Sequence, residues 1–120
     1  MSRVVHFEIS ADNPERAVKF YHNVFGWKIT RWEGPMDYWI ITTGRDKEPG
    51  INGGMIKRAR NETTVNTISV QSVEEYTKKI EQSGGKILVP KSIVPGGGYF
   101  ARCQDTEGNI FGIIEPGESQ

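Results

Sequence analysis

The two halves of this chain carry the same order of predicted elements, and this internal repeat limits the fold more than any other feature. A shift of 59 positions places VNTISVQSVEEYTKKIEQSGGKIL, which begins at Val65, on HFEISADNPERAVKFYHNVFGWKI, which begins at His6. The same shift places IFGIIE (residues 110–115) on INGGMI (residues 51–56). Few letters are identical, so the repeat rests mainly on the matching order of elements. The sequence therefore predicts one structural unit used twice.

The first unit is predicted to contain a strand, a helix and three further strands. The helix follows the strand Val4–Ile9 and begins near Asn13, with Pro14 in its first turn. It ends at Gly26, which supplies a left-handed exit. The remaining extended segments are Trp27–Trp32, Tyr38–Thr43 and Ile51–Ile56.

The second unit repeats this order. Its helix opens on a capping box at residues 72–75 and ends at Gly84-Gly85. Its strands are predicted at Val65–Val70, Lys86–Val89, Tyr99–Cys103 and Ile110–Glu115. We therefore expect an α+β fold of two tandem βαβββ modules in a single domain of residues 1–120, with module 1 at about 1–60 and module 2 at about 61–120.

Composition excludes several classes of partner. Fifteen basic residues balance fifteen acidic ones, so no net charge attracts nucleic acid or an anionic membrane. No apolar run approaches the ~20 residues of a membrane-spanning helix, and the N-terminus has no signal-peptide pattern. The single Cys103 cannot form an internal disulfide and fits a reducing compartment. We expect a cytoplasmic protein.

Two long segments resemble a known family. HFEISADNPERAVKFYHNVFGWKI and EQSGGKILVPKSIVPGGGYFARCQDTEGNIFGIIEP are similar to the glyoxalase, bleomycin-resistance and extradiol-dioxygenase superfamily, also called the vicinal oxygen chelate superfamily. The chain looks most like its small proteins related to lactoylglutathione lyase. The resemblance implies that the two modules curl into a cup, often shared across a homodimer, and we expect a homodimer here.

The resemblance also implies where a metal would be held, on the first and last strand of each module. His6 matches the histidine ligand of the first module, and its repeat partner is Val65. The last-strand positions fall on Gly53 and Gly112, which have no donor atom. Because a zinc or iron site needs at least three protein ligands, we expect no metal cofactor. A recruited divalent metal remains the alternative.

Strand alternation predicts which side chains line the cup. His6 and Glu8 share one face, and the turn of residues 105–108 sets Arg102 opposite Gly112. The same parity turns Ile41, Thr43 and Met55 of the first module inward, together with Trp39. The predicted ligand contacts are His6, Glu8, Trp39, Thr67, Phe100, Arg102 and Ile114.

Two classes of function follow, and both stay open. One is a metal-free binder of a small aromatic or anionic molecule, as in the drug-sequestering members of the family. The other is an enzyme, either a metal-free acid/base catalyst with His6 and Glu8 as candidates or a lyase, isomerase or dioxygenase-type enzyme with a recruited metal. A scaffold with an empty cup is a third alternative, in which His6 is a core histidine and Glu8 pairs with Arg102.

Overall fold

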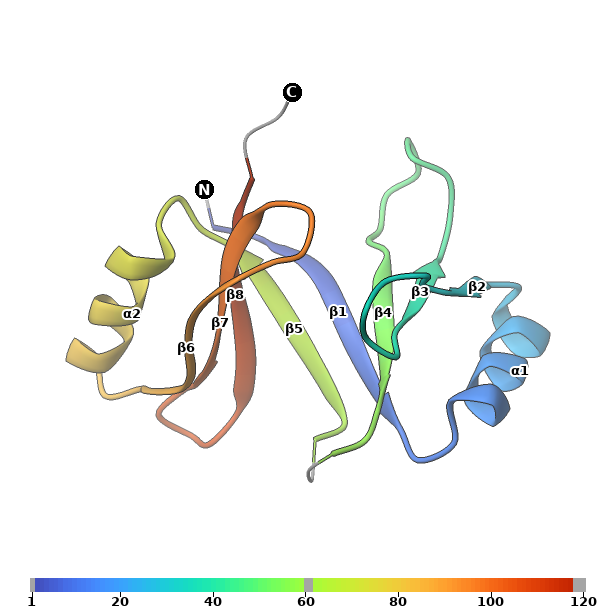
Figure 1. The fold of residues 1–120 in the computed structure, drawn as a ribbon, viewed down its shortest axis with the longest axis horizontal. Coiled ribbons are helices and arrows are strands. Elements are labelled where there is room, and N and C mark those ends of the chain that lie inside the picture. The colour runs from blue at the N-terminus through green and yellow to red at the C-terminus, as the bar shows by residue number, and fades with distance from the viewer. Residues whose placement is uncertain (1, 60–61, 118–120) are drawn as a thin grey trace. The chain divides into compact units, whose positions relative to one another are not determined.

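The structure is a computed structural model that describes residues 2–59 and 62–117 (Figure 1). These residues group into two compact units. One unit consists of residues 6–65, and the other combines the described residues of 1–5 and 66–120. The two units are called module 1 and module 2 below, and each is described by itself.

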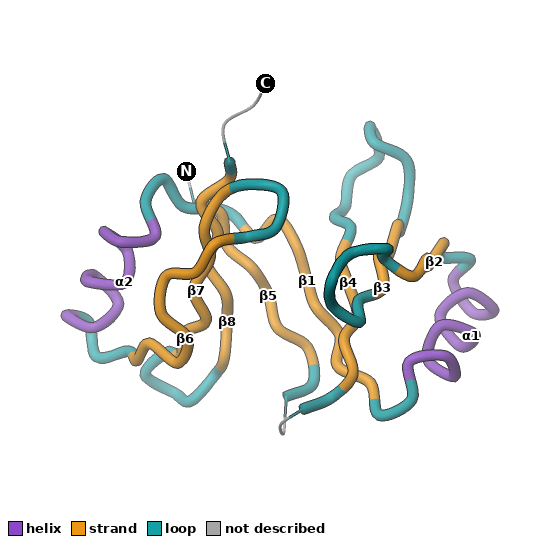
Figure 2. Tube along the Cα trace, viewed as in Figure 1, coloured by secondary structure: helices purple, strands orange, loops and turns teal. Residues whose placement is uncertain are grey.

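Each module has the predicted βαβββ order, so the α+β fold class is confirmed (Figure 2). The elements of the first half are β1 (Val4–Ala11), α1 (Pro14–Phe25), β2 (Lys28–Arg31), β3 (Trp39–Thr42) and β4 (Gly53–Lys57). Those of the second half are β5 (Thr64–Ser69), α2 (Val73–Gln82), β6 (Lys86–Ile93), β7 (Gly98–Gln104) and β8 (Ile110–Pro116). In each module the first strand pairs in parallel with the last, giving the orders β2-β3-β4-β1 and β5-β8-β7-β6.

Local capping explains where the two helices begin and end. The Asn13 side chain accepts a hydrogen bond from the backbone of Arg16, and the Ser72 side chain accepts one from the backbone of Glu75. Gly26 ends α1 in the left-handed conformation, with φ of 74°. The predicted ends of α1 are therefore confirmed, whereas α2 ends at Gln82, slightly before the predicted Gly84.

Each helix packs on one face of its own strands and forms a separate hydrophobic core. In module 1, α1 covers a cluster centred on Ala11, Ile41 and Met55. In module 2, α2 contributes Val73 to a cluster that also includes Ala101 and Cys103 of β7. The burial of Cys103 raises the pKa of its thiol to about 11, so it is protonated and unreactive at neutral pH.

The pairing of β4 with β1 differs from the repeat by one residue. Phe7 lies opposite Gly53, and Glu8 lies opposite Gly54. In module 2, Thr67, the repeat partner of Glu8, lies opposite Gly112. Gly54 therefore corresponds to Gly112, a shift of 58 positions instead of 59. A one-residue slip turns every side chain of a strand to the other face.

This slip overturns the predicted orientation of the module 1 strands. Trp39, Ile41 and Met55 pack in the α1-side core, with Phe7 and Ile9. Trp39 was predicted to share the face of His6 and Glu8, and that prediction is wrong. The opposite face of β3 carries Ile40, which lies opposite Gly54.

The corresponding prediction for module 2 is confirmed. The turn at residues 105–108 closes with hydrogen bonds from Asp105 N to Asn109 O (2.9 Å) and from Gly108 N to Asp105 O (3.3 Å). Gly108 takes the left-handed conformation, with φ of 86°. Arg102 lies opposite Gly112, so it faces away from the α2-side core that holds Ala101 and Cys103.

No helix within residues 2–59 or 62–117 combines the length and the apolar character needed to cross a membrane.

The face assignment on β3 predicts different costs for substitutions at two adjacent residues. Ile41 is 0% exposed and Ile40 is 41% exposed. Ile41→Ala should lower the free energy of unfolding by ~2–5 kcal/mol, because it leaves a cavity in the α1-side core. Ile40→Ala should change it by less than about 1 kcal/mol. Urea unfolding of both variants measures this, and equal losses would contradict the assignment.

Candidate functional site

The polar face of module 1, opposite α1, holds a hydrogen-bonded pair of side chains. His6 Nε2 lies 3.0 Å from Tyr38 Oη, and both residues are half-buried. The hydroxyl donates to Nε2 in one histidine tautomer, and Nε2–H donates to the hydroxyl oxygen in the other. His6 comes from β1 and Tyr38 from the residue just before β3. We call these two residues the His6–Tyr38 pair.

A glycine makes room for this pair. Gly54, on β4, shares the face of Glu8 and is buried. The Tyr38 hydroxyl and the end of its ring lie in the space that a Cβ atom on residue 54 would occupy. A Cβ atom on residue 53, in contrast, would meet the Phe7 ring on the α1 side. Gly54 therefore takes the place on this face that the repeat assigned to Gly53, and Tyr38 covers it.

The loop between β2 and β3 holds Tyr38 in place. Trp32 N donates a hydrogen bond to Tyr38 O (2.7 Å), and the two aromatic rings meet edge to face at 6.2 Å. Arg31 forms an ion pair with Asp37 across the same loop. The Trp32 indole fills the space beside Gly34, where a Cβ atom would collide with it. Two of these contacts involve Tyr38 itself, and the other two lie in the loop that carries it.

Burial keeps the His6–Tyr38 pair uncharged near neutral pH. Desolvation lowers the pKa of His6, although the Glu8 charge opposes this effect. Desolvation raises the pKa of Tyr38, and the Glu8 charge raises it further. Glu8 therefore acts electrostatically on both members of the pair. The neutral pair can donate and accept hydrogen bonds toward a bound molecule.

The predicted residues of module 2 lie together on the face of its sheet opposite α2. Phe100 and Ile114 are opposite each other across β7 and β8, as are Arg102 and Gly112. Thr67 Oγ1 would lie 3.3 Å from a Cβ atom at Gly112. Thr67, Phe100, Arg102 and Ile114 are all half-buried. Their predicted common face is therefore observed, and binding there stays a prediction.

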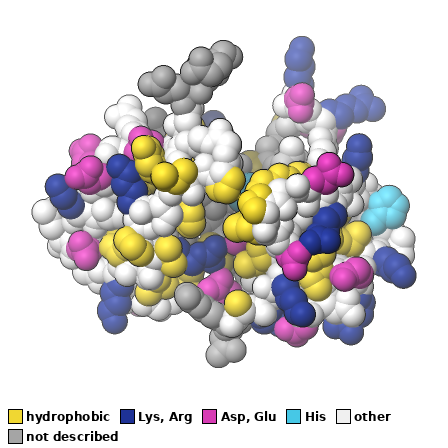
Figure 3. All heavy atoms as spheres, in the orientation of Figure 1, with side chains coloured by type: hydrophobic (Ala, Val, Ile, Leu, Met, Phe, Trp, Pro, Cys, Tyr) yellow, Lys and Arg dark blue, Asp and Glu magenta, His cyan; other side chains and the backbone are white. Residues whose placement is uncertain are grey.

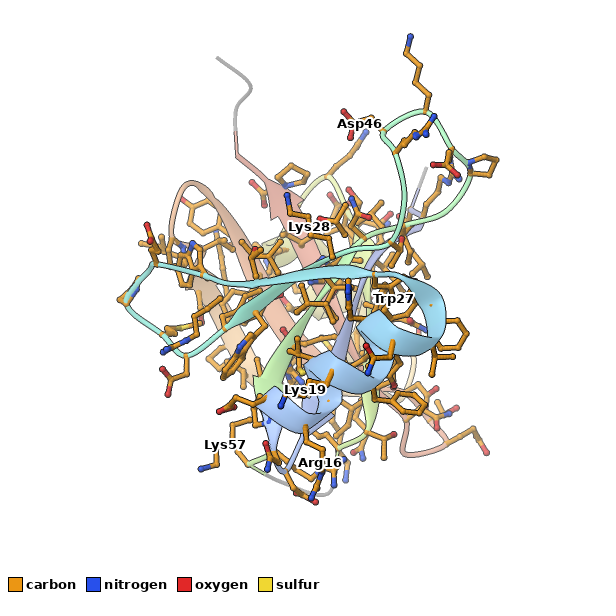
Figure 4. The ribbon with its side chains drawn as sticks, turned by 90° about the vertical axis from the view of Figure 1, so that its right-hand side faces the viewer. Arg16, Lys19, Trp27, Lys28, Asp46 and Lys57 are labelled. Carbon is orange, nitrogen blue, oxygen red and sulfur yellow. The ribbon has the colours of Figure 1, made fainter. Side chains whose placement is uncertain are left out.

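Two other side chains with donor atoms lie away from these faces. Glu115 Oε1 accepts a hydrogen bond from the backbone N–H of Val73 (3.0 Å), at the start of α2. His22 is exposed on α1, where its Nδ1 lies 3.0 Å from Trp27 O. Figure 4 views module 1 from the side of this helix, with Arg16 and Lys19 on it and Trp27 just beyond its end.

Sequence reasoning missed Tyr38 as a site residue. The prediction placed it at the start of a strand but assigned it no role, because the predicted register turned Gly53 to the polar face instead of Gly54. The available signal was strand alternation: Tyr38 and Ile40 point away from Trp39, so they share the face of His6 once the register of β4 is known.

Comparison with known proteins gives the family. The model of the Glyoxalase/Bleomycin resistance protein/Dioxygenase superfamily matches residues 3–113. The chain belongs to this superfamily. The expected family resemblance is thereby confirmed over nearly the whole chain.

Individual relatives of this superfamily are distant. A mycobacterial protein named "Putative glyoxylase CFP32", from Mycobacterium bovis and from Mycobacterium tuberculosis, is 24% identical over 115 residues, which are 94% of this chain and 44% of the relative. This chain thus spans less than half the length of the curated relatives that it matches.

Solved structures share the fold of this superfamily member. A hypothetical protein from Bacillus halodurans, BH1468, matches with a TM-score of 0.71 and 14% identity, over 99% of this chain and 97% of the other. Methylmalonyl-CoA epimerase from Mycobacterium tuberculosis matches with a TM-score of 0.70 and 11% identity, over 96% and 88%. At these identities the likeness shows the fold alone.

The family's metal does not fit the residues of module 1. His6 Nε2 is hydrogen-bonded to Tyr38, and Tyr38 occupies the space where a side chain at position 54 would project. Within the described part of the chain, no three His, Cys, Asp or Glu side chains group in a way that could hold a metal ion. Three protein ligands are the usual minimum for a catalytic zinc site.

The pair predicts two limbs of pH-dependent stability. The native pKa of His6 lies below the unfolded value of 6.5. The contribution of neutral, buried His6 to the free energy of unfolding is therefore complete above pH 6.5 and is lost as the pH falls through the native pKa. The native pKa of Tyr38 lies above the unfolded value of 10.0, so its contribution is complete below pH 10 and is lost as the pH rises.

Thermal melts from pH 5 to 11 measure both limbs. His6→Gln should flatten the acid limb relative to wild type, and Tyr38→Phe should flatten the alkaline limb. If both variants follow the wild-type profile at each end, the shifts assigned to these residues are wrong.

Proposed function

We propose that this chain binds a small organic molecule on the polar face of module 1 without a resident divalent metal. The observation that carries the proposal is the His6–Tyr38 pair, which occupies the place of metal ligands with a neutral hydrogen-bonding group. Small-molecule sites combine a few polar groups with an apolar wall. The face supplies the polar groups through His6, Tyr38 and Glu8.

The apolar part of the site comes from the strands beside the pair. Ile40 lies opposite Gly54, and Ile56 lies opposite Ser10, so both share the face of His6 and Glu8. Ile40 is partly open to solvent. Ile40 thus takes the role that the sequence assigned to Trp39. A ligand with a flat or apolar body and a polar oxygen matches this arrangement.

For module 2 we propose that Thr67, Phe100, Arg102 and Ile114 contact ligand, with Arg102 favouring an anionic group. The charged side chains on the face drawn in Figure 3 are of both signs and intermixed, which agrees with the balanced composition. Because the overall charge is balanced, a preference for an anionic ligand would come from Arg102 itself.

An acid/base enzyme is the second candidate. Its supporting observation is that His6 is neutral near pH 7, which is the form that a general base requires. His6 also interacts electrostatically with Glu8, the second candidate. The names of the relatives, a glyoxylase and an epimerase, point the same way. Mass spectrometry of a bound compound after incubation separates the two functions, since an enzyme converts it and a binder returns it unchanged.

The metal-free site predicts that the Tyr38 hydroxyl contributes to ligand affinity. A thermal-shift screen over aromatic acids, thiol conjugates and antibiotics, with EDTA present, should find a stabilising compound. Tyr38→Phe should weaken the binding of that compound about fivefold to tenfold, or by ~1–1.5 kcal/mol, because one hydrogen bond is lost.

Tyr99→Phe is the matched control, because Tyr99 belongs to β7 of module 2, where its ring centroid lies 4.3 Å from Lys91 Nζ. The control should bind like wild type. Equal affinity of wild type and Tyr38→Phe, measured by calorimetry, would remove Tyr38 from the site.

We also propose that the chain forms a homodimer. Large apolar side chains are exposed on α1 and β6 in the described structure, among them Phe20, Phe25 and Ile93, the last with 75% of its surface open. A second copy of the chain would remove such side chains from water, which favours association. Light scattering at micromolar concentration should give twice the mass of 13.5 kDa, and a monomeric mass would contradict this proposal.

A further inference from the structure

Strands β1 and β4 bring three positions onto one face of module 1. His6 and Glu8 are two residues apart on β1, and Gly54 lies opposite Glu8 on β4. An imidazole and a carboxylate are both metal donors, and a third donor at position 54 would complete a common ligand number. In this chain the third position is a glycine.

Tyr38 occupies the space of that third side chain. Its hydroxyl lies where a Cβ atom on residue 54 would stand, so a side chain at 54 and Tyr38 in its present position exclude each other. The same hydroxyl is bonded to His6 Nε2, at 3.0 Å. One residue thus covers one ligand position and engages the donor atom of another.

Tyr38 is held there by contacts that do not involve His6. Its carbonyl accepts from Trp32 N at 2.7 Å, its ring meets the Trp32 ring edge to face, and the Arg31–Asp37 ion pair closes the loop beside it. A side chain fixed in this way needs little additional ordering to stay over Gly54.

We propose that Tyr38 excludes divalent metal ions from the His6 face and so determines the metal-free character of this site. The missing donors account for weak metal binding, and Tyr38 adds a second barrier, because a cation would have to displace the hydroxyl from His6. This inference goes beyond the proposed ligand binding and requires no organic ligand for its test. If ligand binding fails its test, the proposal of metal exclusion is unaffected, and the reverse also holds.

Cobalt binding tests the exclusion directly. The probe is Co²⁺, measured by equilibrium dialysis and by its visible absorption, on wild type, Gly54→Glu, and Tyr38→Ala/Gly54→Glu. Wild type should retain no stoichiometric cobalt. The double variant should bind about one equivalent, at least tenfold more tightly than Gly54→Glu, because in the single variant the Tyr38 side chain still competes for the space at residue 54 and for His6.

Adding His6→Ala to the double variant is the control and should abolish the binding. The proposal is overturned if wild type binds one equivalent that depends on His6. It is also overturned if Gly54→Glu binds cobalt as tightly as the double variant, or if a double variant with a cooperative melting transition binds none.

A second measurement covers the case in which the double variant does not fold. Tyr38→Phe keeps the ring and removes only the hydroxyl. Diethyl pyrocarbonate should then modify His6 several-fold faster than in wild type, with the exposed His22 as internal reference, as read by peptide mass spectrometry. An unchanged ratio of His6 to His22 modification would show that the hydroxyl does not protect Nε2, and would overturn the proposal.

Discussion

The pairing register of β4 against β1 is the constraint on which the rest of module 1 depends. With Glu8 opposite Gly54, Met55 and Gly53 turn toward α1, and position 54 turns toward His6. β3 then pairs with β4 so that Ile41 enters the core and Ile40 faces the other way. Because side chains alternate along a strand, a shift of one residue in this register would turn Ile41 and Met55 away from α1.

The two faces of module 1 differ in chemical character. The α1 face is a dense aromatic and aliphatic core, in which the Tyr21 and Trp27 rings stack at 5.0 Å and Phe7 lies 5.9 Å from Trp27. The opposite face carries polar groups that are half-buried and hydrogen-bonded. Burial on this second face keeps the His6–Tyr38 pair neutral, and a neutral pair can both donate and accept hydrogen bonds.

The sequence was sufficient where structure is decided locally. The Asn13 and Ser72 caps, the Gly26 exit and the turn at Asp105 each depend on a few neighbouring residues, and each was predicted. That turn also gave the correct face for Arg102, since a short hairpin fixes the register of its strands.

The sequence was insufficient where contacts span long stretches of chain. β3 and β4 are joined by residues 43–52, in which Thr43 N bonds the Asn52 side chain and Thr43 Oγ1 bonds Ile51 O. β3 and β4 keep the predicted phase, with Trp39 opposite Met55. The register of β4 against β1 is set by no short turn, so the repeat placed Gly53 opposite Glu8 where Gly54 lies, and Trp39 was assigned to the wrong face. His6 and Tyr38 are 32 residues apart in the sequence, and no pattern of neighbouring residues predicts their contact.

In module 1, the Tyr38 hydroxyl thus lies beside His6, in the space that a side chain on residue 54 would need. The nitrogen NMR signals of the two histidine rings test this arrangement most directly, because His22 provides an exposed reference in the same spectrum. His6 should stay neutral to a pH below the ordinary imidazole pKa of 6.5, and its Nε2 signal should shift in Tyr38→Phe while that of His22 does not. A His6 ring that becomes charged at or above pH 6.5, with an Nε2 signal unchanged by Tyr38→Phe, would contradict the hydrogen bond on which this account rests.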